Sequence, residues 1–572
     1  MSMRRVLLLL WLLAMVAGSR SWAAVRNASF EIVVVHDVVD TRSALDPDSI
    51  STTDLVSFLE WLRAHKWNFI SLDDVERARK GESPLPQRAI LITVDDGYLS
   101  EYTRIFPLLL AYKVPAVMAL VGSWMDGKAS SGRPEITWEQ AREMQRSGLV
   151  EFASHSYDMH HGMIGNPQGN VFPPAAFRKY EPGVGYESEA AYRERIRADL
   201  TRSVEQMKKE LGRAPRSLAW PYGRYTEEGE EVASEVGFAF TFILDPEPAF
   251  LDKPIGMGRY YLTTNNVVDA RRRLFQTPLP AIQRLVHVNP ADLWNADAGQ
   301  ADTRLGKAIE RLRELGATAV VVDAVEEDSN GKITRAWFPN SQLPLGADWF
   351  LRVCQQMRAR AEVAVYGRMP VQKTLEAMNG NADRVLALFR EIGIHGAIDG
   401  IFLENTPGLA GIKTEPNDSG SAPWEVRRRR DAVDDSRLSP LDSLTLRCFH
   451  AVEAERSGLK LALANPIANN TGPSSIADIS LVLAPDQPKE VARLQNVMRT
   501  LGWFQPMFAR RFGLWIDSPT PPAPGNLSTI TRRFEREGGA VIGWSADDPM
   551  GDKPPAARVA AAVSASTFPI RF

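Results

Sequence analysis

Short apolar runs alternate with amphipathic stretches along the chain from Phe30 onward, and this alternation restricts the possible folds more than any other feature. Such a pattern is typical of an α/β protein with parallel strands. Segments such as 53–64, 138–147 and 190–211 have the apolar spacing of helices. In this first, barrel-like half the expected strands are 32–35, 89–94, 115–121, 150–153, 217–220 and 238–243.

A second series of apolar runs begins at Leu285 and has eight members, the number that a (β/α)8 barrel requires. Its expected strands are 285–288, 319–322, 363–366, 398–403, 459–464, 479–483, 512–516 and 540–544, with helical patterns at 304–315, 349–358, 382–392, 444–457 and 527–537. Long loops are expected at 405–436, with the basic run 427–430, and at 518–526. The restart of the strand series predicts two α/β barrel domains, residues 24–280 and 281–572.

Composition and charge agree with this organisation. The 572 residues include 67 Lys and Arg against 70 Asp and Glu, so the formal net charge is −3. A strong field of one sign that would recruit nucleic acid is therefore excluded. With 44% hydrophobic and 24% charged residues the chain can bury large cores. Because barrels of roughly 250 residues fold as single domains, two of them account for the length.

The N-terminus has the features of a signal peptide. Met3-Arg4-Arg5 precedes an apolar run at 6–18, which is shorter than the ~20 residues of a membrane-spanning helix. Ser21-Trp22-Ala23 offers a small-x-small cleavage pattern, so residues 1–23 are expected to be removed and the mature protein exported. The alternative is a buried N-terminal helix.

The two cysteines, Cys354 and Cys448, both lie in helical patterns. No cysteine precedes Cys354, so nothing marks a lipoprotein. In an oxidising compartment the two could pair, and the alternative is two buried free thiols.

Four of the eight histidines gather at two expected strand ends of the first half. His36 follows the strand at 32–35, whereas His155, His160 and His161 follow the strand at 150–153. Adjacent carboxylates, Asp95-Asp96, close the strand at 89–94. We expect these strand ends to lie on one face and to form one site.

Two imidazoles and one carboxylate match the ligands of a catalytic divalent metal ion, in which a fourth position stays open for water. His155, His160 and one aspartate supply that set. The other aspartate can then take a proton from the water, while the metal polarises the carbonyl under attack. Zinc is the default ion for these ligands, and iron, cobalt or nickel would also accept imidazole.

Three more residues could take part in the same reaction. His36 suits the general acid that protonates a departing amine. The backbone N–H after Pro221, at Tyr222, could help to hold an oxyanion, and Arg216 could pair with Asp95 and keep it ionised and oriented. The simpler alternatives are a structural histidine, a turn proline and a surface arginine.

These motifs resemble those of the polysaccharide deacetylases, carbohydrate esterase family 4. The matching segments are Thr93-Val94-Asp95-Asp96-Gly97, Ser154-His155 with His160, and Arg216 with Pro221-Tyr222. The resemblance implies that Asp95 is the base and that Arg216 orients it. It also implies that Asp96, His155 and His160 bind the metal ion, in a domain that forms a distorted barrel.

The position of His36 narrows the resemblance. Usual members carry the general-acid histidine near the C-terminal end of the domain, but this chain has no histidine between His161 and His287. Val34-Val35-His36-Asp37 resembles instead the exported poly-β-1,6-N-acetyl-D-glucosamine N-deacetylases of the PgaB type, as do 137–140, 150–155 and 160–162. This implies an enzyme that removes acetyl groups from a biofilm polymer in the periplasm or at the outer membrane, with an export pore as a partner.

The resemblance continues over the second half at 285–288, 337–340, 398–401 and 543–548, and implies a barrel related to glycoside hydrolases. Such barrels bind and cut the partly deacetylated polymer. After the fourth strand, however, the family has a His-Asp-Asp triplet, and this chain has Asn405-Thr406 in place of the two aspartates. At the fifth strand, Asn465-Pro466 replaces an Arg-Asn pair.

Glycoside hydrolysis needs two carboxyl groups about 5 to 10 Å apart. Acids remain at four expected strand ends, so a shifted pair that includes Glu404 stays open: Asp323, Glu404, Asp517 and Asp548. We expect chiefly a glycan-binding barrel, in which Trp294, Trp515 and Trp544 could stack on sugars or could be core aromatics.

Two other functions stay open. One is a deacetylase of chitin oligomers or peptidoglycan, with the second barrel as an unrelated binding module. The other is a non-catalytic glycan-binding protein with two degenerate barrels, against which the complete set of Asp96, His155 and His160 argues.

Overall fold

The computed structural model describes residues 29–40, 46–128, 132–275, 282–404, 409, 423–466, 474, 476–500 and 511–567. Its contacts divide the chain into two units. The first comprises the chain up to Met163, Pro173–Ala176 and Glu187–Gln276, and the second comprises Ile164–Phe172, Phe177–Tyr186 and Thr277–Phe572. The expected signal peptide, the expected domain boundary at 280, and Asn405-Thr406 lie outside the described residues. Within the described part, no helix has the length and apolar character needed to cross a membrane.

The first unit is built on a nine-stranded sheet whose main path is β13-β12-β7-β6-β5-β1-β14. The parallel strands expected from the sequence are all present, and they pair with one another in parallel. They are β1 (Ser29–Val35), β5 (Ala89–Asp96), β6 (Ala116–Leu120), β7 (Val150–Ser154), β12 (Ser217–Ala219) and β13 (Phe240–Phe242). Short strands β4 (Asn68–Phe69), β14 (Ala249–Phe250) and β15 (Tyr260–Tyr261) complete the sheet.

An irregular segment, 254–261, connects the β13 edge of this sheet with β1. On one side, Met257 donates its N–H to the Thr241 carbonyl at 2.8 Å and accepts from the Ile243 N–H at 2.9 Å. On the other side, β15 pairs in parallel with β1, with Tyr261 opposite Val34. The segment thereby bridges β13 and β1, and the sheet forms a half-barrel, the distorted barrel that the sequence predicted.

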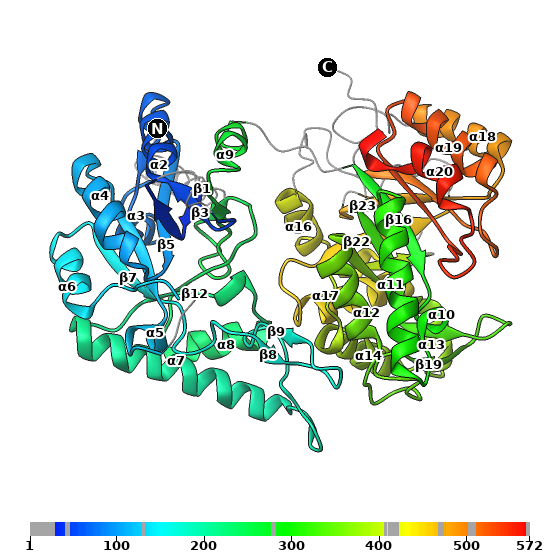
Figure 1. The fold of residues 1–572 in the computed structure, drawn as a ribbon, viewed down its shortest axis with the longest axis horizontal. Helices are drawn as coiled ribbons and strands as arrows, with labels where there is room; N and C mark the ends of the chain where they lie inside the picture. The colour runs from blue at the N-terminus through cyan, green and yellow to red at the C-terminus, as the bar shows by residue number, and fades with distance from the viewer. Residues whose placement is uncertain are drawn as a thin grey trace, which may run out of the picture. The chain divides into compact units, whose positions relative to one another are not determined.

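Helices cover the outside of the first sheet (Figure 1). Ser51 caps α2 by accepting the Asp54 N–H, and Thr137 with Gln140 forms a capping box at α6. The helix ends therefore follow local sequence signals. The helices are α2 (Thr52–Ala64), α3 (Leu72–Arg79), α4 (Phe106–Tyr112) after the π-turn η2 (Glu101–Ile105), α5 (Gly122–Met125), α6 (Trp138–Arg146), α7 (Glu189–Leu211), α8 (Glu227–Val236) and α9 (Val267–Arg273).

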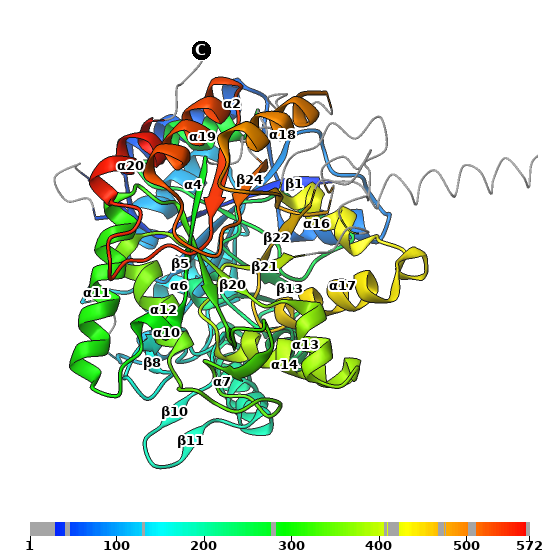
Figure 2. The ribbon, with the colours of Figure 1, turned by 90° about the vertical axis from the view of Figure 1, so that its right-hand side faces the viewer.

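The second unit is a closed barrel of eight parallel strands, each at a position expected from the sequence. These are β16 (Gln283–Val288), β17 (Ala319–Asp323), β20 (Ala364–Arg368), β21 (Gly400–Glu404), β22 (Lys460–Asn465), β23 (Ile479–Ala484), β24 (Phe512–Ile516) and β25 (Val541–Trp544). Figure 2 shows helices around them: α11 (Ala298–Glu314), α12 (Phe350–Gln356), α13 (Val371–Ala377), α14 (Ala382–His395), α17 (Pro440–Glu453), α18 (Pro488–Thr500), α19 (Pro524–Arg536) and α20 (Ala556–Val563).

Two expected loops of the second barrel were wrong in part. The basic run 427–430 lies on helix α16 (Pro423–Asp431), and α19 begins at Pro524, inside the second expected loop. Arg430 is buried, donates to the Ile476 carbonyl at 3.0 Å and lies 4.2 Å above the ring of Phe449. Arg430 is therefore packed against neighbouring residues of the barrel and is not exposed in a loop. Both cysteines, Cys354 and Cys448, are buried and free.

Two segments expected in the first domain, 164–172 and 177–186, make their contacts within the second unit. The Tyr186 hydroxyl donates to Asp348 Oδ2 at 2.7 Å, and Gln168 Nε2 donates to the Asp348 carbonyl at 2.7 Å. Each unit is therefore made of several segments of the chain, and no single position in the sequence separates the two.

Candidate active site

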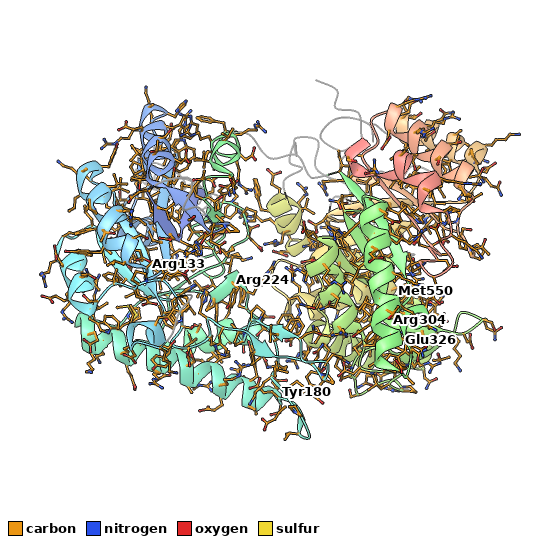
Figure 3. All side chains as sticks on the ribbon, in the orientation of Figure 1. Arg133, Tyr180, Arg224, Arg304, Glu326 and Met550 are labelled. Atoms are coloured by element: carbon orange, nitrogen blue, oxygen red, sulfur yellow. The ribbon has the colours of Figure 1, made fainter. Side chains whose placement is uncertain are left out.

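A cavity of about 700 Å³ lies at the carboxyl ends of the parallel strands of the first unit. Six predicted residues line it: His36, Asp95, Asp96, His155, His160 and Tyr222. Arg133, which Figure 3 labels, belongs to the same wall. The structure therefore brings the predicted strand ends together, as parallel strands require.

The end of β5 delivers both of its carboxylates to this cavity. Neighbouring residues of a strand normally point to opposite faces. Asp96 has a φ of 93°, in the left-handed region, and this turn interrupts the alternation. The buried Glu101 side chain supports the turn by accepting the Gly97 N–H at 2.7 Å. Adjacent residues, Asp95 and Asp96, can therefore act on the same ligand.

Asp96, His155 and His160 form a candidate metal centre. Asp96 Oδ1 lies 3.5 Å from His155 Nε2 and 3.4 Å from His160 Nε2. Candidate ligand atoms of the three residues lie within 4.8 Å of one another. Asp96 Oδ1 is buried and has no hydrogen-bond partner among the described residues. An unsatisfied buried oxygen that faces two imidazole nitrogens fits a divalent cation.

The two imidazoles are held in different ways. His155 Nδ1 lies 2.7 Å from the Ala219 carbonyl, so this nitrogen donates and Nε2 is left with its lone pair towards Asp96. The ring of His160 packs between Trp124, at 4.9 Å between centroids, and Tyr222, at 4.6 Å. Both arrangements direct a nitrogen into the cavity.

The electrostatics keep two of the candidate ligands, His160 and Asp96, in the form that binds a metal ion. Burial, together with neighbouring His155, lowers the pKa of His160 to about 4, so its imidazole is neutral at neutral pH. Burial alone would raise the pKa of Asp96, but contact with His155 and the nearby His36 holds that pKa well below its ordinary value. A neutral imidazole and an ionised carboxylate are what a metal ion requires.

Arg259 is the partner of Asp95. Its Nη1 and Nη2 donate to the two carboxylate oxygens at 2.7 Å each, and both side chains are about 1% exposed. Burial would raise the pKa of Asp95, but the Arg259 guanidinium lowers it below the ordinary value. Asp95 therefore stays ionised in a fixed orientation, as a general base needs.

The prediction that Arg216 orients Asp95 was wrong. Arg216 directly precedes β12, so it lies at the amino end of the parallel strands, whereas Asp95 lies at a carboxyl end. It donates to Glu151 with two bonds of 2.8 Å, and it also bonds to Glu76 and Asp73. Arg259 was missed because it belongs to the irregular segment 254–261, where no strand pattern marks it.

His36 and Tyr222 occupy the rim of the same cavity. His36 follows β1, and its ring meets the edge of Tyr261 at 4.5 Å between centroids. His36 Nδ1 is buried and has no hydrogen-bond partner among the described residues. Tyr222 lies in the turn Pro221–Gly223 with a φ of 59°, and its side chain is 40% exposed. Sequence reasoning missed Tyr261, whose hydroxyl donates to Asp48 Oδ1 at 2.9 Å.

The second barrel has an ion-pair network at the carboxyl ends of its strands. His287 Nε2 lies 2.9 Å from Asp323 Oδ2, and Arg368 Nη1 donates to Asp323 Oδ1 at 2.9 Å. Arg368 also donates to both carboxylate oxygens of Glu404, at 3.0 and 3.1 Å. Despite burial, His287 and Arg368 lower the pKa of Asp323 to about 2. The predicted acids Asp323 and Glu404 are thus both paired with one arginine.

Other predicted residues of the second barrel are structural. Trp544 and Trp515 are 0% and 1% exposed, so neither can stack on a sugar. The alternative of core aromatics is confirmed for both, and the assignment of Trp544 to substrate binding was wrong. Trp544 donates to Asp547 Oδ1 at 3.2 Å, and Trp515 packs on Phe402 inside the barrel.

The two remaining acids have local partners. Asp548 accepts the N–H groups of Met550 and Gly551 in a turn, at 3.0 and 2.8 Å. Asp517 is exposed and accepts from the Ser545 hydroxyl at 3.3 Å. Trp294 is half-buried and meets the edge of Trp349. Among these, Asp517 remains accessible to a ligand.

Family models match both halves of the chain. Residues 82–241 match a model described as polysaccharide deacetylase, and residues 287–381 match one described as hypothetical glycosyl hydrolase family 13. The chain is 32% identical over 355 residues to a poly-beta-1,6-N-acetyl-D-glucosamine N-deacetylase of Escherichia coli (strain K12), covering 60% of this chain and 53% of the relative. The chain thus spans about half the length of this curated relative.

Two solved structures are similar to the chain. One is the BpsB deacetylase domain from Bordetella bronchiseptica, with 38% identity, 41% of this chain and 96% of that chain covered, and a TM-score of 0.37. The other is a de-N-acetylase from Aggregatibacter actinomycetemcomitans, with 31% identity, 43% of this chain and 100% of that chain covered, and a TM-score of 0.40.

Replacing Arg259 with Met removes the cation that contacts Asp95 and leaves a buried charge. We expect the pKa of Asp95, measured by carboxyl-carbon NMR, to rise, and the free energy of unfolding at pH 7 to fall by about 3–5 kcal/mol. Arg259 lowers the folded pKa of Asp95 below the unfolded value of about 3.9, so the pair stabilises the fold above about pH 4. The difference between Arg259→Met and wild type should therefore narrow as the pH falls through the folded pKa.

Arg216→Met is the matched control, because it removes a cation from the opposite end of the same strands. It should leave the pKa of Asp95 in place. A shift in Arg216→Met together with an unchanged pKa in Arg259→Met would contradict this assignment.

Proposed function

We propose that the chain, which matches a polysaccharide deacetylase model over residues 82–241 and is similar to a poly-beta-1,6-N-acetyl-D-glucosamine N-deacetylase, is itself a metal-dependent N-deacetylase of poly-β-1,6-N-acetyl-D-glucosamine. The observation that carries the proposal is that the two adjacent aspartates at the end of β5 have different partners. Asp96 faces two imidazole nitrogens, whereas Asp95 is held ionised by Arg259. A ligand set and a separate base in one cavity are the requirements of amide hydrolysis assisted by a metal.

In this reaction each residue has one task. Asp96, His155 and His160 would hold the ion, for which zinc is the default; when bound, it would polarise the acetamide carbonyl and lower the pKa of water. Asp95 accepts the proton of the attacking water. The backbone N–H of Tyr222 donates to the oxyanion. His36 protonates the amine nitrogen as its bond to the acetyl carbon breaks and acetate is formed. The position of His36 and Tyr222 on the cavity wall supports these roles.

The same proposal includes a signal peptide, a cellular compartment and a partner. Residues 1–23 act as a signal peptide, and the mature chain works in the periplasm or at the outer membrane. An outer-membrane export pore is the expected partner, since a deacetylated polymer carries cationic amines and would need passage out of the cell.

Removing the metal ion tests the reaction. Chelated wild type should lose acetate release from β-1,6-linked N-acetylglucosamine oligomers and regain it with zinc.

Asp95→Asn, loaded with zinc, should be slower by about 10²- to 10⁴-fold, because the proton acceptor is lost. The exposed Asp269→Asn on α9 is the control and should keep wild-type rates. Zinc-loaded wild type no faster than Asp95→Asn would refute the deacetylase proposal, and faster release from β-1,4 oligomers would favour chitin or peptidoglycan as substrate.

For the second barrel we propose glycan binding without hydrolysis. Arg368 contacts both Asp323 and Glu404, so the two acids near the barrel mouth are charge-paired and neither is a free proton donor. Carboxylates in such a network can still accept hydrogen bonds from sugar hydroxyls and amines.

Binding and cutting can be separated in the full-length Asp95→Asn variant, which leaves acetyl groups untouched. Incubated with partly deacetylated β-1,6 polymer, it should release no shorter fragments. Adding Glu404→Gln should weaken calorimetric binding of the oligomers about tenfold, because a charged acceptor is lost while its shape is kept. Fragments in the first experiment would overturn the binding-only view.

A further inference from the structure

Trp124 is a buried aromatic residue that neither the base nor the ligand set requires. It lies on the short helix α5, which directly follows β6, and is 9% exposed. Its ring meets the ring of His160 at 4.9 Å between centroids and 66° between planes, an edge-to-face geometry. It lines the same cavity as His160. Trp124 therefore contacts a candidate metal ligand directly.

The helix that carries Trp124 is bonded to the loop that carries the histidines. Gly122 donates its N–H to the Ser156 carbonyl at 3.1 Å, and Ser123 donates to the Tyr157 carbonyl at 2.6 Å. A Cβ atom at Gly122 would come within 2.8 Å of the Tyr157 ring, so the two segments are in close contact. The position of Trp124 relative to the histidine loop is thus set by the backbone.

The two imidazoles differ in what fixes them. His155 has the Ala219 carbonyl on its second nitrogen, the usual way in which a metal-binding histidine is oriented. The ring of His160 contacts the rings of Trp124 and Tyr222 and, at 5.0 Å between centroids, that of the other candidate ligand, His155. Tyr222 is 40% exposed, whereas Trp124 is buried. Of these two aromatic residues, Trp124 therefore restricts the His160 ring more than Tyr222 does.

We propose that Trp124 is a positioning residue, whose ring holds the imidazole of His160 in the orientation that binds the metal ion. This inference rests on the proposed function only for the identity of the site. Trp124 acts through His160 and takes no part in proton transfer. Its removal should let the imidazole rotate away from Asp96 and should weaken metal binding before it affects the fold.

Zinc titration by calorimetry of the full chain, first freed of metal, tests this role. Trp124→Leu should bind zinc about tenfold more weakly than wild type, as when the supporting partner of a metal ligand is lost. Trp124→Phe keeps an aromatic ring and should restore most of the affinity. Phe106→Leu is the matched control, because Phe106 is a buried aromatic residue, 7% exposed, that packs on Tyr102. Phe106→Leu should bind zinc like wild type.

The possible results separate this role from others. Thermal unfolding of the metal-free variants shows whether each one is folded. If Trp124→Leu is not, Trp124→Met takes its place as the non-aromatic variant and should also bind zinc more weakly than wild type. Wild-type zinc affinity in the folded non-aromatic variant, or equal weakening in Phe106→Leu, would overturn the proposal. A raised KM with unchanged zinc affinity would also overturn it, by assigning Trp124 to substrate. Loss of acetate release in wild type concerns the proposed function alone and leaves the zinc comparison intact.

Discussion

The ion pair between Arg259 and Asp95 is the interaction on which the candidate site depends. Two carboxylates that adjoin in sequence and share one cavity repel each other, and such pairs normally retain a proton. Here the guanidinium binds both oxygens of Asp95, whereas Asp96 faces the imidazoles of His155 and His160. The two acids are thereby separated into a charged base and a metal ligand, although one residue type supplies both.

The same contact connects the site to the fold. Arg259 lies between Met257, which bonds to β13, and Tyr260, which pairs with β1, so it is carried by the segment that bridges these two strands. Its Nε donates to the Ile243 carbonyl and its Nη1 also reaches the Thr93 hydroxyl, both at 3.3 Å. These contacts hold Arg259 against Asp95. The segment that bridges β13 and β1 thus also positions the cation that keeps the base ionised.

Much of this arrangement could be predicted from the sequence. The strands are apolar runs between helical patterns, and the parallel order follows from that alternation. Because the carboxyl ends of parallel strands meet, Asp96, His155 and His160 could be assigned to one site before any contact was known. Eight strands of the second barrel were found in the same way.

The errors have physical causes. Arg216 was predicted as the partner of Asp95 from a motif, but it directly precedes β12 and so lies at the amino end of the strands, away from the site. Strands buried on both faces read as continuous apolar runs, so the sequence could not tell that Trp515 points into the barrel. Gly543 leaves room for that ring, since a Cβ there would lie 2.6 Å from it. Such contacts between strands distant in sequence leave no local pattern.

The most direct test of this account is the coordination of zinc in wild type, Asp95→Asn and Asp96→Asn, measured by X-ray absorption at the zinc edge. The account predicts two imidazole nitrogens and a carboxylate oxygen in wild type and in Asp95→Asn, and loss of the carboxylate ligand in Asp96→Asn. If Asp95→Asn lost that ligand, or Asp96→Asn kept it, the separation of the two aspartates into base and ligand would be contradicted.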